Sequence, residues 1–161
     1  MYEWAVNALQ TWASFYANHA AIRTTVGFLH VGGLLASGGC AIAADRLTLL
    51  YRREPLASRM AQLKDLRGTH RIVLVGLVLV VVSGLLLFAA DTDTYLHSIL
   101  FWTKMGLFAL LVINGSLLVR AEGQAEAGNP QGWKRLNVTA IASIALWFLT
   151  TLIGAALPNI G

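Results

Sequence analysis

The sequence predicts an all-α integral membrane protein: a bundle of four transmembrane helices, preceded by an amphipathic helix at the membrane interface. Of its 161 residues, 57% are hydrophobic and 12% are charged, whereas about a quarter are charged in an ordinary soluble domain. Four apolar runs each approach the roughly 20 residues that a helix needs to cross the hydrocarbon layer. The basic residues, in addition, are concentrated in two of the segments that separate these runs.

Residues 1–21 predict the interfacial helix. Trp4, Ala8, Trp12 and Phe15 recur at helical spacing on one side of this segment, and polar residues occupy the other side. A helix of this kind lies in the plane of the membrane surface, with its indole rings among the headgroups. The segment lacks the basic start and the cleavage site of a secretory signal, which argues against that alternative.

Residues 22–161 predict the transmembrane domain, with spans at about 22–44, 71–90, 98–119 and 136–157. The second span is rich in β-branched residues, which favour strands in soluble proteins. An open strand in lipid would leave its backbone N–H and C=O groups unpaired, so the length of the run decides in favour of a helix.

The basic residues predict the orientation of the spans. Seven of the twelve Lys and Arg residues lie in segment 45–71 and three lie in segment 120–135. The positive-inside rule places both loops in the cytoplasm. The connection 91–97 carries two aspartates and no Lys or Arg, so we expect it to face outward with both termini. These features predict a multi-pass protein of the bacterial cytoplasmic membrane, whose net charge of +4 requires no nucleic-acid partner.

His30 is the histidine within the uncharged stretch 24–44. Hydrocarbon offers an imidazole no water, so an ionisable group at this depth is a functional hypothesis. Small residues near it, including Gly33 and Ser37, would let a flat ligand or another helix approach the backbone closely. His30 is then either the axial ligand of a haem iron, which makes it the metal-binding residue, or a residue that hydrogen-bonds a backbone group or hydroxyl in a helix–helix contact.

Lys104 interrupts the third span at about the depth of His30. His97 precedes Lys104 by seven residues, or two helical turns, and is therefore expected on the same helical face. Lys104 could face the slot beside His30 and pair with a haem propionate or take part in ligation, or it could extend its ammonium toward the outer headgroups. His97 would then either guard the outward end of the pocket or lie at the membrane boundary without a role.

A second polar layer is predicted at the cytoplasmic ends of the first two spans. It consists of Asp45, Arg46, His70 and Arg71. A quinone headgroup needs a hydrogen-bond donor and a proton-exchanging group at such a boundary. The same residues could instead cap the first span and bind lipid phosphate.

Several short motifs share one order along the chain. They are Leu29-His30, Asp45-Arg46-Leu47 with Tyr51, Ser83-Gly84-Leu85, and Phe101-Trp102-Thr103-Lys104 with Asn114. This layout resembles the small membrane protoporphyrinogen oxidase family of bacteria, and it is also similar to the copper-resistance D-type membrane domains. The resemblance implies a b-type haem, with His30 in the place of the haem-binding histidine and Lys104 in the place of the functional lysine.

These observations predict a b-type haem protein that transfers electrons, with a quinone or another membrane redox subunit as its partner. Whether it is also a membrane oxidoreductase is left open. The alternative is a cofactor-free accessory subunit of a larger respiratory or photosynthetic complex, or a homo-oligomer, that docks through its glycine-rich faces. Copper transport is a weaker third option, because one cysteine and three methionines supply few of the soft sulfur ligands that copper prefers.

Overall fold

The computed structural model describes residues 3–160, and nearly all of them are helical. The elements are α1 (Glu3–Asn18), α2 (Ala20–Leu50), the 3-10 turn η1 (Tyr51–Arg53), α3 (Leu56–Ala90), α4 (Thr92–His97), α5 (Ile99–Glu126) and α6 (Pro130–Ile160). Within the described range there is no strand. Helices α2, α3, α5 and α6 are each long and apolar enough to cross a membrane. This confirms the all-helical prediction, including the β-branched run in α3.

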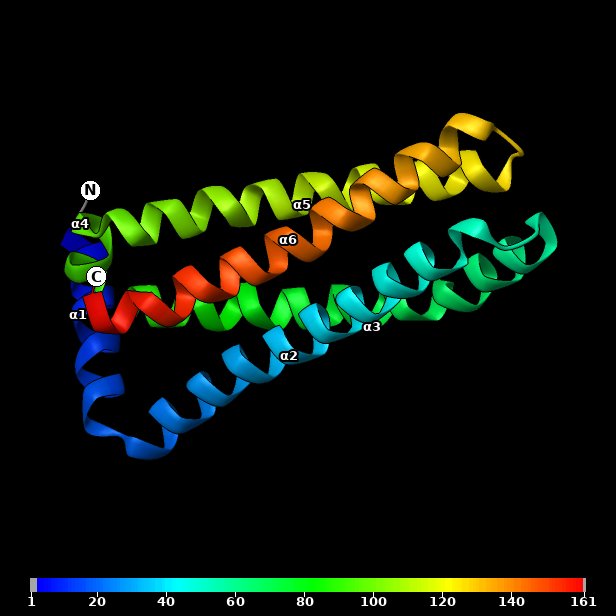
Figure 1. Cartoon of the computed structure of the whole chain (residues 1–161). Helices are drawn as coiled ribbons and strands as arrows, with labels where there is room; N and C mark the ends of the chain where they lie inside the picture. Colours follow the sequence, from blue (N-terminus) through cyan, green and yellow to red (C-terminus); the bar gives the residue numbers. More distant parts are fainter. Residues whose placement is uncertain (1–2, 161) are drawn as a thin grey trace.

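The four long helices form two hairpins, α2 with α3 and α5 with α6 (Figure 1). Gly33 and Gly76 let the backbones of α2 and α3 touch, because a Cβ atom on Gly33 would lie 2.9 Å from the Gly76 carbonyl oxygen. The hairpins meet through α2 and α6, where the Trp147 ring packs directly on Gly38. Glycines on α2 therefore determine how closely both of its neighbours approach.

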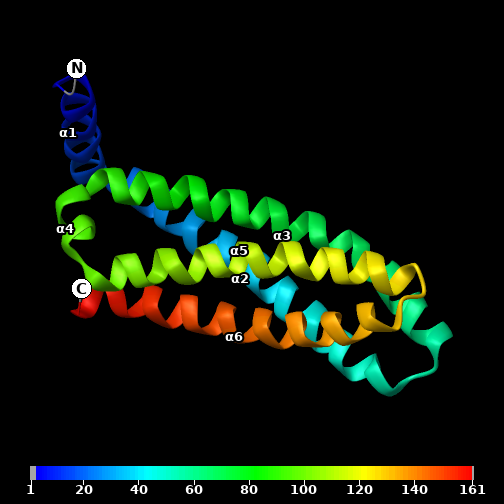
Figure 2. The same cartoon turned by 90° about the horizontal axis from the view of Figure 1, so that it is seen from above.

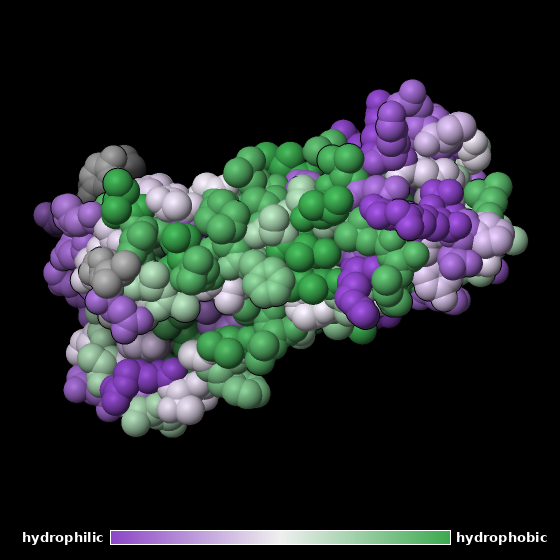
Figure 3. Space-filling model, viewed as in Figure 1, coloured by the Kyte–Doolittle hydropathy of each residue, from purple (hydrophilic) through white to green (hydrophobic). Residues whose placement is uncertain are grey.

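Each hairpin loop lies at the same end of the bundle, and the two termini lie with α1 and α4 at the other end (Figures 1 and 2). The two basic segments, 45–71 and 120–135, consequently share the loop end. On the face drawn in Figure 3, hydrophilic residues gather at both ends and an apolar band lies between them. A membrane protein with one consistent orientation requires this arrangement.

The helices extend beyond the predicted spans at the loop end. At 1.5 Å per residue, the 35 residues of α3 measure about 52 Å, whereas the hydrocarbon core of a bilayer is about 30 Å thick. The projecting tips have a small core of their own, formed by Leu63, Ala121, Ala125 and Leu136. Next to it the guanidinium of Arg59 stacks over the Trp133 ring, 3.8 Å from the ring centroid, and so ties the tips of the two hairpins together.

Helix α1 runs across the ends of the long helices (Figure 1). The indole Nε1 of Trp12 donates to the Leu86 carbonyl oxygen of α3 at 2.9 Å, whereas Trp4 is 73% exposed. Trp12 was expected among lipid headgroups, but a carbonyl oxygen can accept a second hydrogen bond and here fixes the indole to the bundle. Residues 1 and 2 of the predicted surface helix lie outside the described residues.

Candidate functional site

Two groups of polar side chains lie between the long helices. We call them the terminus layer (His30, Ser83 and Lys104) and the loop layer (Asp45, His70, Glu122 and Ser143), after the nearer end of the bundle. A rise of 1.5 Å per residue from His30 to Asp45 separates the layers by about 22 Å along α2. No single metal ion or headgroup can contact both layers.

In the terminus layer, His30 of α2 is held by Ser83 of α3. The ring Nδ1 lies 3.1 Å from Ser83 Oγ, and the Ser83 hydroxyl itself donates to the Leu79 carbonyl one turn earlier. A hydroxyl has one proton to give, so Ser83 accepts from His30 and Nδ1 carries the ring proton. The backbone of Val80 also hydrogen-bonds the ring. With the ring proton on Nδ1, the lone pair of Nε2 is not used by Ser83.

Glycine makes room for both basic side chains of this layer, His30 and Lys104. Gly84 on α3 lies against the His30 ring, since a Cβ atom there would be 3.3 Å from Cε1. Gly154 on α6 lies under Lys104, and a Cβ atom there would be 3.4 Å from both Cε and Nζ. The half-buried Lys104 ammonium interacts electrostatically with His30. Among the described residues, Lys104 has no ion pair or hydrogen bond.

The predicted slot at Gly33 and Ser37 is filled by α3. A Cβ atom on Gly76 would lie 2.8 Å from the Ser37 backbone nitrogen, and the Ser37 hydroxyl donates to the Gly33 carbonyl at 2.7 Å. Small residues allow close contact between helices, and in this chain the backbone of α3 occupies the space beside them. These two residues therefore form the helix–helix contact that was the alternative interpretation, and they do not line an open slot.

His97 does not share a helical face with Lys104. Helix α4 ends at His97 and α5 begins at Ile99, because Ser98 adopts an extended conformation and its side chain accepts a hydrogen bond from the Phe101 N–H at 3.3 Å. This N-cap interrupts the helix, so a spacing of seven residues no longer places His97 and Lys104 on the same helical face. The exposed His97 ring donates from Nδ1 to the Asp93 carbonyl of its own helix at 2.8 Å.

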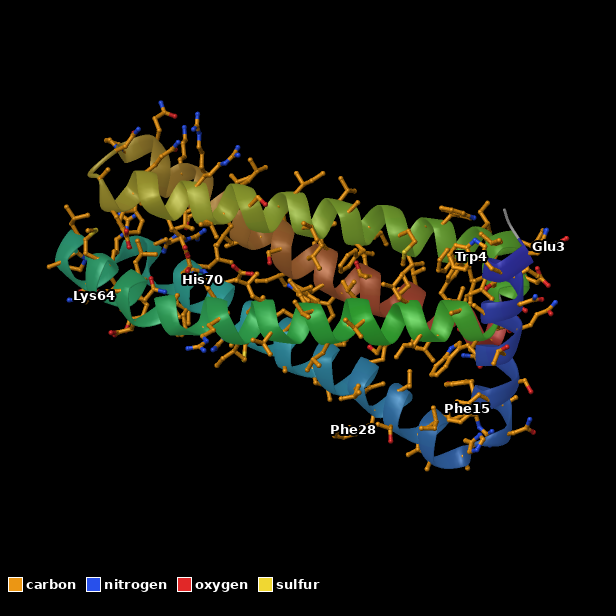
Figure 4. All side chains as sticks on the ribbon, turned by 180° about the vertical axis from the view of Figure 1, so that it is seen from behind. Glu3, Trp4, Phe15, Phe28, Lys64 and His70 are labelled. Carbon is orange, nitrogen blue, oxygen red and sulfur yellow. The ribbon has the colours of Figure 1, made fainter. Side chains whose placement is uncertain are left out.

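The loop layer takes one side chain from each long helix. His70 of α3, near the loop end in Figure 4, and Glu122 of α5 form an ion pair with 3.4 Å between Nε2 and Oε2. Asp45 of α2 is 5% exposed; the Ser143 hydroxyl of α6 hydrogen-bonds its carboxyl group, and His70 and Glu122 interact with it electrostatically. The buried Oδ2 of Asp45 has no hydrogen-bond partner.

The sequence prediction for this layer grouped Asp45 with His70 and left out Glu122 and Ser143. Asp45 and His70 interact electrostatically, whereas Arg46 and Arg71 are exposed on the surface of the bundle. Glu122 lay in a polar tract that was given no role, and Ser143 lay inside an apolar span. Glu122 lies three residues beyond the loop end of the predicted third span, so its depth was a usable signal, whereas Ser143 lies seven residues inside the predicted fourth span and gave no such signal.

No protein-family model, curated protein or solved structure matches the chain.

The donor groups of the terminus layer fit one class of metal cofactor. Within residues 3–160 no three His, Cys, Asp or Glu side chains are grouped so that they could hold a metal ion. A haem brings four nitrogens of its own and asks the protein only for axial ligands. One free histidine nitrogen beside one amine therefore suits a haem iron better than an ion held by protein ligands alone.

Proposed function

We propose that this chain is a b-type haem protein of the bacterial cytoplasmic membrane that transfers electrons. It crosses the membrane four times, with both termini outside. Four helices of membrane-spanning length and apolarity support the four crossings. The two basic loops at one end of the bundle support the orientation, because basic loops remain in the cytoplasm.

The free Nε2 of His30 carries the proposal. When bound there, haem would supply the one-electron chemistry of its iron. A histidine that ligates a metal usually donates its other ring N–H to a fixed acceptor, which sets the orientation of the ring, and Ser83 acts as that acceptor. Lys104 contributes a positive charge that has no carboxylate partner among the described residues, and a haem propionate would neutralise it.

The decisive test is the reduced-minus-oxidised absorption spectrum of the purified protein. The parent protein should show the bands of a b-type haem, and His30→Ala should lose them. His19→Ala and His97→Ala are matched controls, because both rings are exposed and hydrogen-bond carbonyls of residues four positions earlier. A folded His30→Ala protein with its full haem content would exclude His30 as the ligand.

A substitution of Lys104 distinguishes contact with haem from contact with lipid headgroups. If Lys104 pairs with a propionate or ligates the iron, Lys104→Met should lower haem retention or change the midpoint potential. A spectrum and a potential identical to those of the parent protein would instead identify Lys104 as a residue that extends toward the headgroups. Lys64→Met, at an exposed position of α3 near the loop end, controls for the loss of one charge.

We further propose a quinone as the electron partner, bound at the loop layer. Asp45 and His70 support this choice, because they combine hydrogen bonding with proton exchange at the boundary of the apolar band. Asp45→Asn should slow reduction of a soluble quinone analogue without loss of haem. Arg46→Gln, at the next residue but on the exposed side of α2, should leave the rate unchanged.

The outer face of α2 favours the second candidate function, an accessory subunit of a larger membrane complex. Gly32, Ala36, Gly39 and Ala43 recur at helical spacing on a side that none of the helices described in residues 3–160 covers. Such a stripe would let a helix of a partner subunit approach closely. Haem-free protein that migrates with a redox complex on native gels, and is released by Gly39→Leu, would favour this function over electron transfer.

A further inference from the structure

The loop layer has the organisation of a path for protons. We propose that His70, Glu122 and Asp45 form a proton relay that begins at the surface of the loop end and terminates at Oδ2 of Asp45. The relay is independent of haem binding and of the identity of any electron partner. It rests on the order of exposure of the three side chains, on the ion pair between two of them, and on the unpartnered oxygen of the third.

Exposure decreases along the three groups. The side chain of His70 is 34% exposed and that of Glu122 is 15% exposed, whereas Asp45 is 5% exposed. Imidazole exchanges protons readily with water near neutral pH, so the most exposed group of the three is also the one suited to receive a proton. Its Nε2 already faces Glu122 Oε2 at 3.4 Å.

Asp45 has the properties of a terminal acceptor. Its Oδ2 is buried without a hydrogen bond, and an ionised oxygen in that position is unfavourable because nothing replaces the water it has lost. The groups that face it from the other helices are His70 on α3, Glu122 on α5 and the uncharged Ser143 on α6. His70 is paired with Glu122, so a proton on Oδ2 is the direct way to neutralise Asp45.

The transfer moves one proton and no electrons. In the ion pair both ring nitrogens of His70 carry a proton, and the proton on Nε2 passes to Oε2 of Glu122, which leaves the imidazole neutral. Glu122 then gives its proton to Oδ2 of Asp45. The imidazole takes up a new proton from water, which restores the ion pair, and the layer has gained one proton in total. Two carboxyl groups that repel each other share a proton readily, since ionising both is unfavourable.

The hairpin arrangement makes the relay dependent on tertiary structure. Asp45 and His70 belong to the α2–α3 hairpin, whereas Glu122 and Ser143 belong to the α5–α6 hairpin. Each transfer therefore crosses between hairpins, and the path exists only while the two hairpins are packed together.

Infrared difference spectroscopy of the full-length protein in lipid nanodiscs tests the end point. A pH decrease should produce the C=O band of a protonated carboxyl group, and Asp45→Asn should remove this band. Asp65→Asn, which alters an exposed carboxyl group at the same end of the bundle, should keep it. An unchanged band in Asp45→Asn would overturn the proposal. The haem-free His30→Ala protein should show the same band, so failure of the haem proposal is a separate result.

Deuterium exchange of that band tests the entry and leaves Asp45 intact. His70→Gln and Glu122→Gln should slow the exchange, on the order of 100-fold, the lower range of what a positioned acid–base group contributes. Arg71→Gln, an exposed neighbour of His70, should have no effect. Exchange in both relay variants at the parent rate would show that protons reach Asp45 by another path, and would overturn the relay.

Discussion

Single hydrogen bonds determine what the polar residues of this protein can do. Ser83 gives its only proton to the Leu79 carbonyl, so it must accept from His30, and the free lone pair of the imidazole is left on Nε2. At Asp45 the effect is opposite, because Ser143 reaches the carboxyl group while Oδ2 keeps no partner. In the terminus layer a serine thus defines which atom of its neighbour is available for chemistry, and in the loop layer the available atom is the unpartnered Oδ2 of Asp45.

Ser83→Ala should weaken haem binding without removing it. The variant loses the acceptor that orients His30, and loss of such a partner of a metal ligand typically lowers affinity by about 10- to 100-fold. Haem titration of the purified protein, followed by absorbance, measures the change. Ser116→Ala removes an exposed hydroxyl that bonds only the Val112 carbonyl, and should bind haem as the parent does. Equal affinity in Ser83→Ala would contradict an axial role for His30.

At the scale of the helices, close contacts between backbones hold α2 against its neighbours, where a soluble protein would pack large apolar side chains in a core. The α2–α3 contact centres on Gly33 and Gly76, and the α2–α6 contact seats Trp147 on Gly38. If the four helices span a membrane as proposed, the hydrophobic effect does not drive them together in lipid, and close van der Waals packing at small residues must supply much of the stability.

Gly33→Leu should therefore destabilise the protein, whereas Gly32→Leu should be tolerated. A side chain at position 33 would collide with the Gly76 carbonyl, while a Cβ atom at position 32 meets nothing within 4 Å. Overpacking of a close contact typically costs about 1–3 kcal/mol. Unfolding in detergent, compared between the two variants, measures the difference, and equal stability would mean that α2 and α3 are not in backbone contact.

Trp12→Phe should release α1 from the bundle. The phenylalanine ring keeps the apolar contact but cannot donate to the Leu86 carbonyl, and one such bond contributes about 1 kcal/mol. Hydrogen–deuterium exchange of the α1 amides should accelerate by about fivefold, which corresponds to that free energy. Trp4→Phe changes an exposed ring and serves as the control; equal exchange in the two variants would exclude Trp12 as the tether.

At the scale of the whole molecule, orientation and chemistry depend on each other. Both basic loops lie at the end that carries the loop layer, while α1 and α4 lie at the other end (Figure 1). With the loops in the cytoplasm, the proposed relay opens to that side and the terminus layer lies nearer the opposite surface. The two layers would then communicate with different compartments.

Reversing the charge of the connection between α3 and α5 should disturb this orientation. In a Cys40→Ala background, a single cysteine at Thr94 should react with a membrane-impermeant maleimide from outside intact cells. Adding Asp91→Arg and Asp93→Arg should lower that labelling, since basic residues resist export across the membrane. The uncharged pair Asp91→Asn and Asp93→Asn is the control. Efficient labelling of the arginine variant would show that the two basic loops outweigh the connection.

The sequence alone determined the helical class, the four apolar spans and the end at which the charges gather. Length, polarity and charge are local properties, and lipid permits a long apolar run little other than a helix. The same local reasoning placed Asp45 and His70 at one depth, and the two side chains interact electrostatically.

Only the tertiary structure decided which residues meet. Helices that are apolar on every side give little periodic signal, so the rotation that turns Gly33 toward Gly76 and His30 toward Ser83 arises from packing between helices. For the same reason, no sequence motif predicts that Glu122 and Ser143 belong to the loop layer. His97 does not lie beside Lys104 as expected, because one helix ends before Ser98 and the next begins after it. A break of one residue turns every following side chain to a new direction.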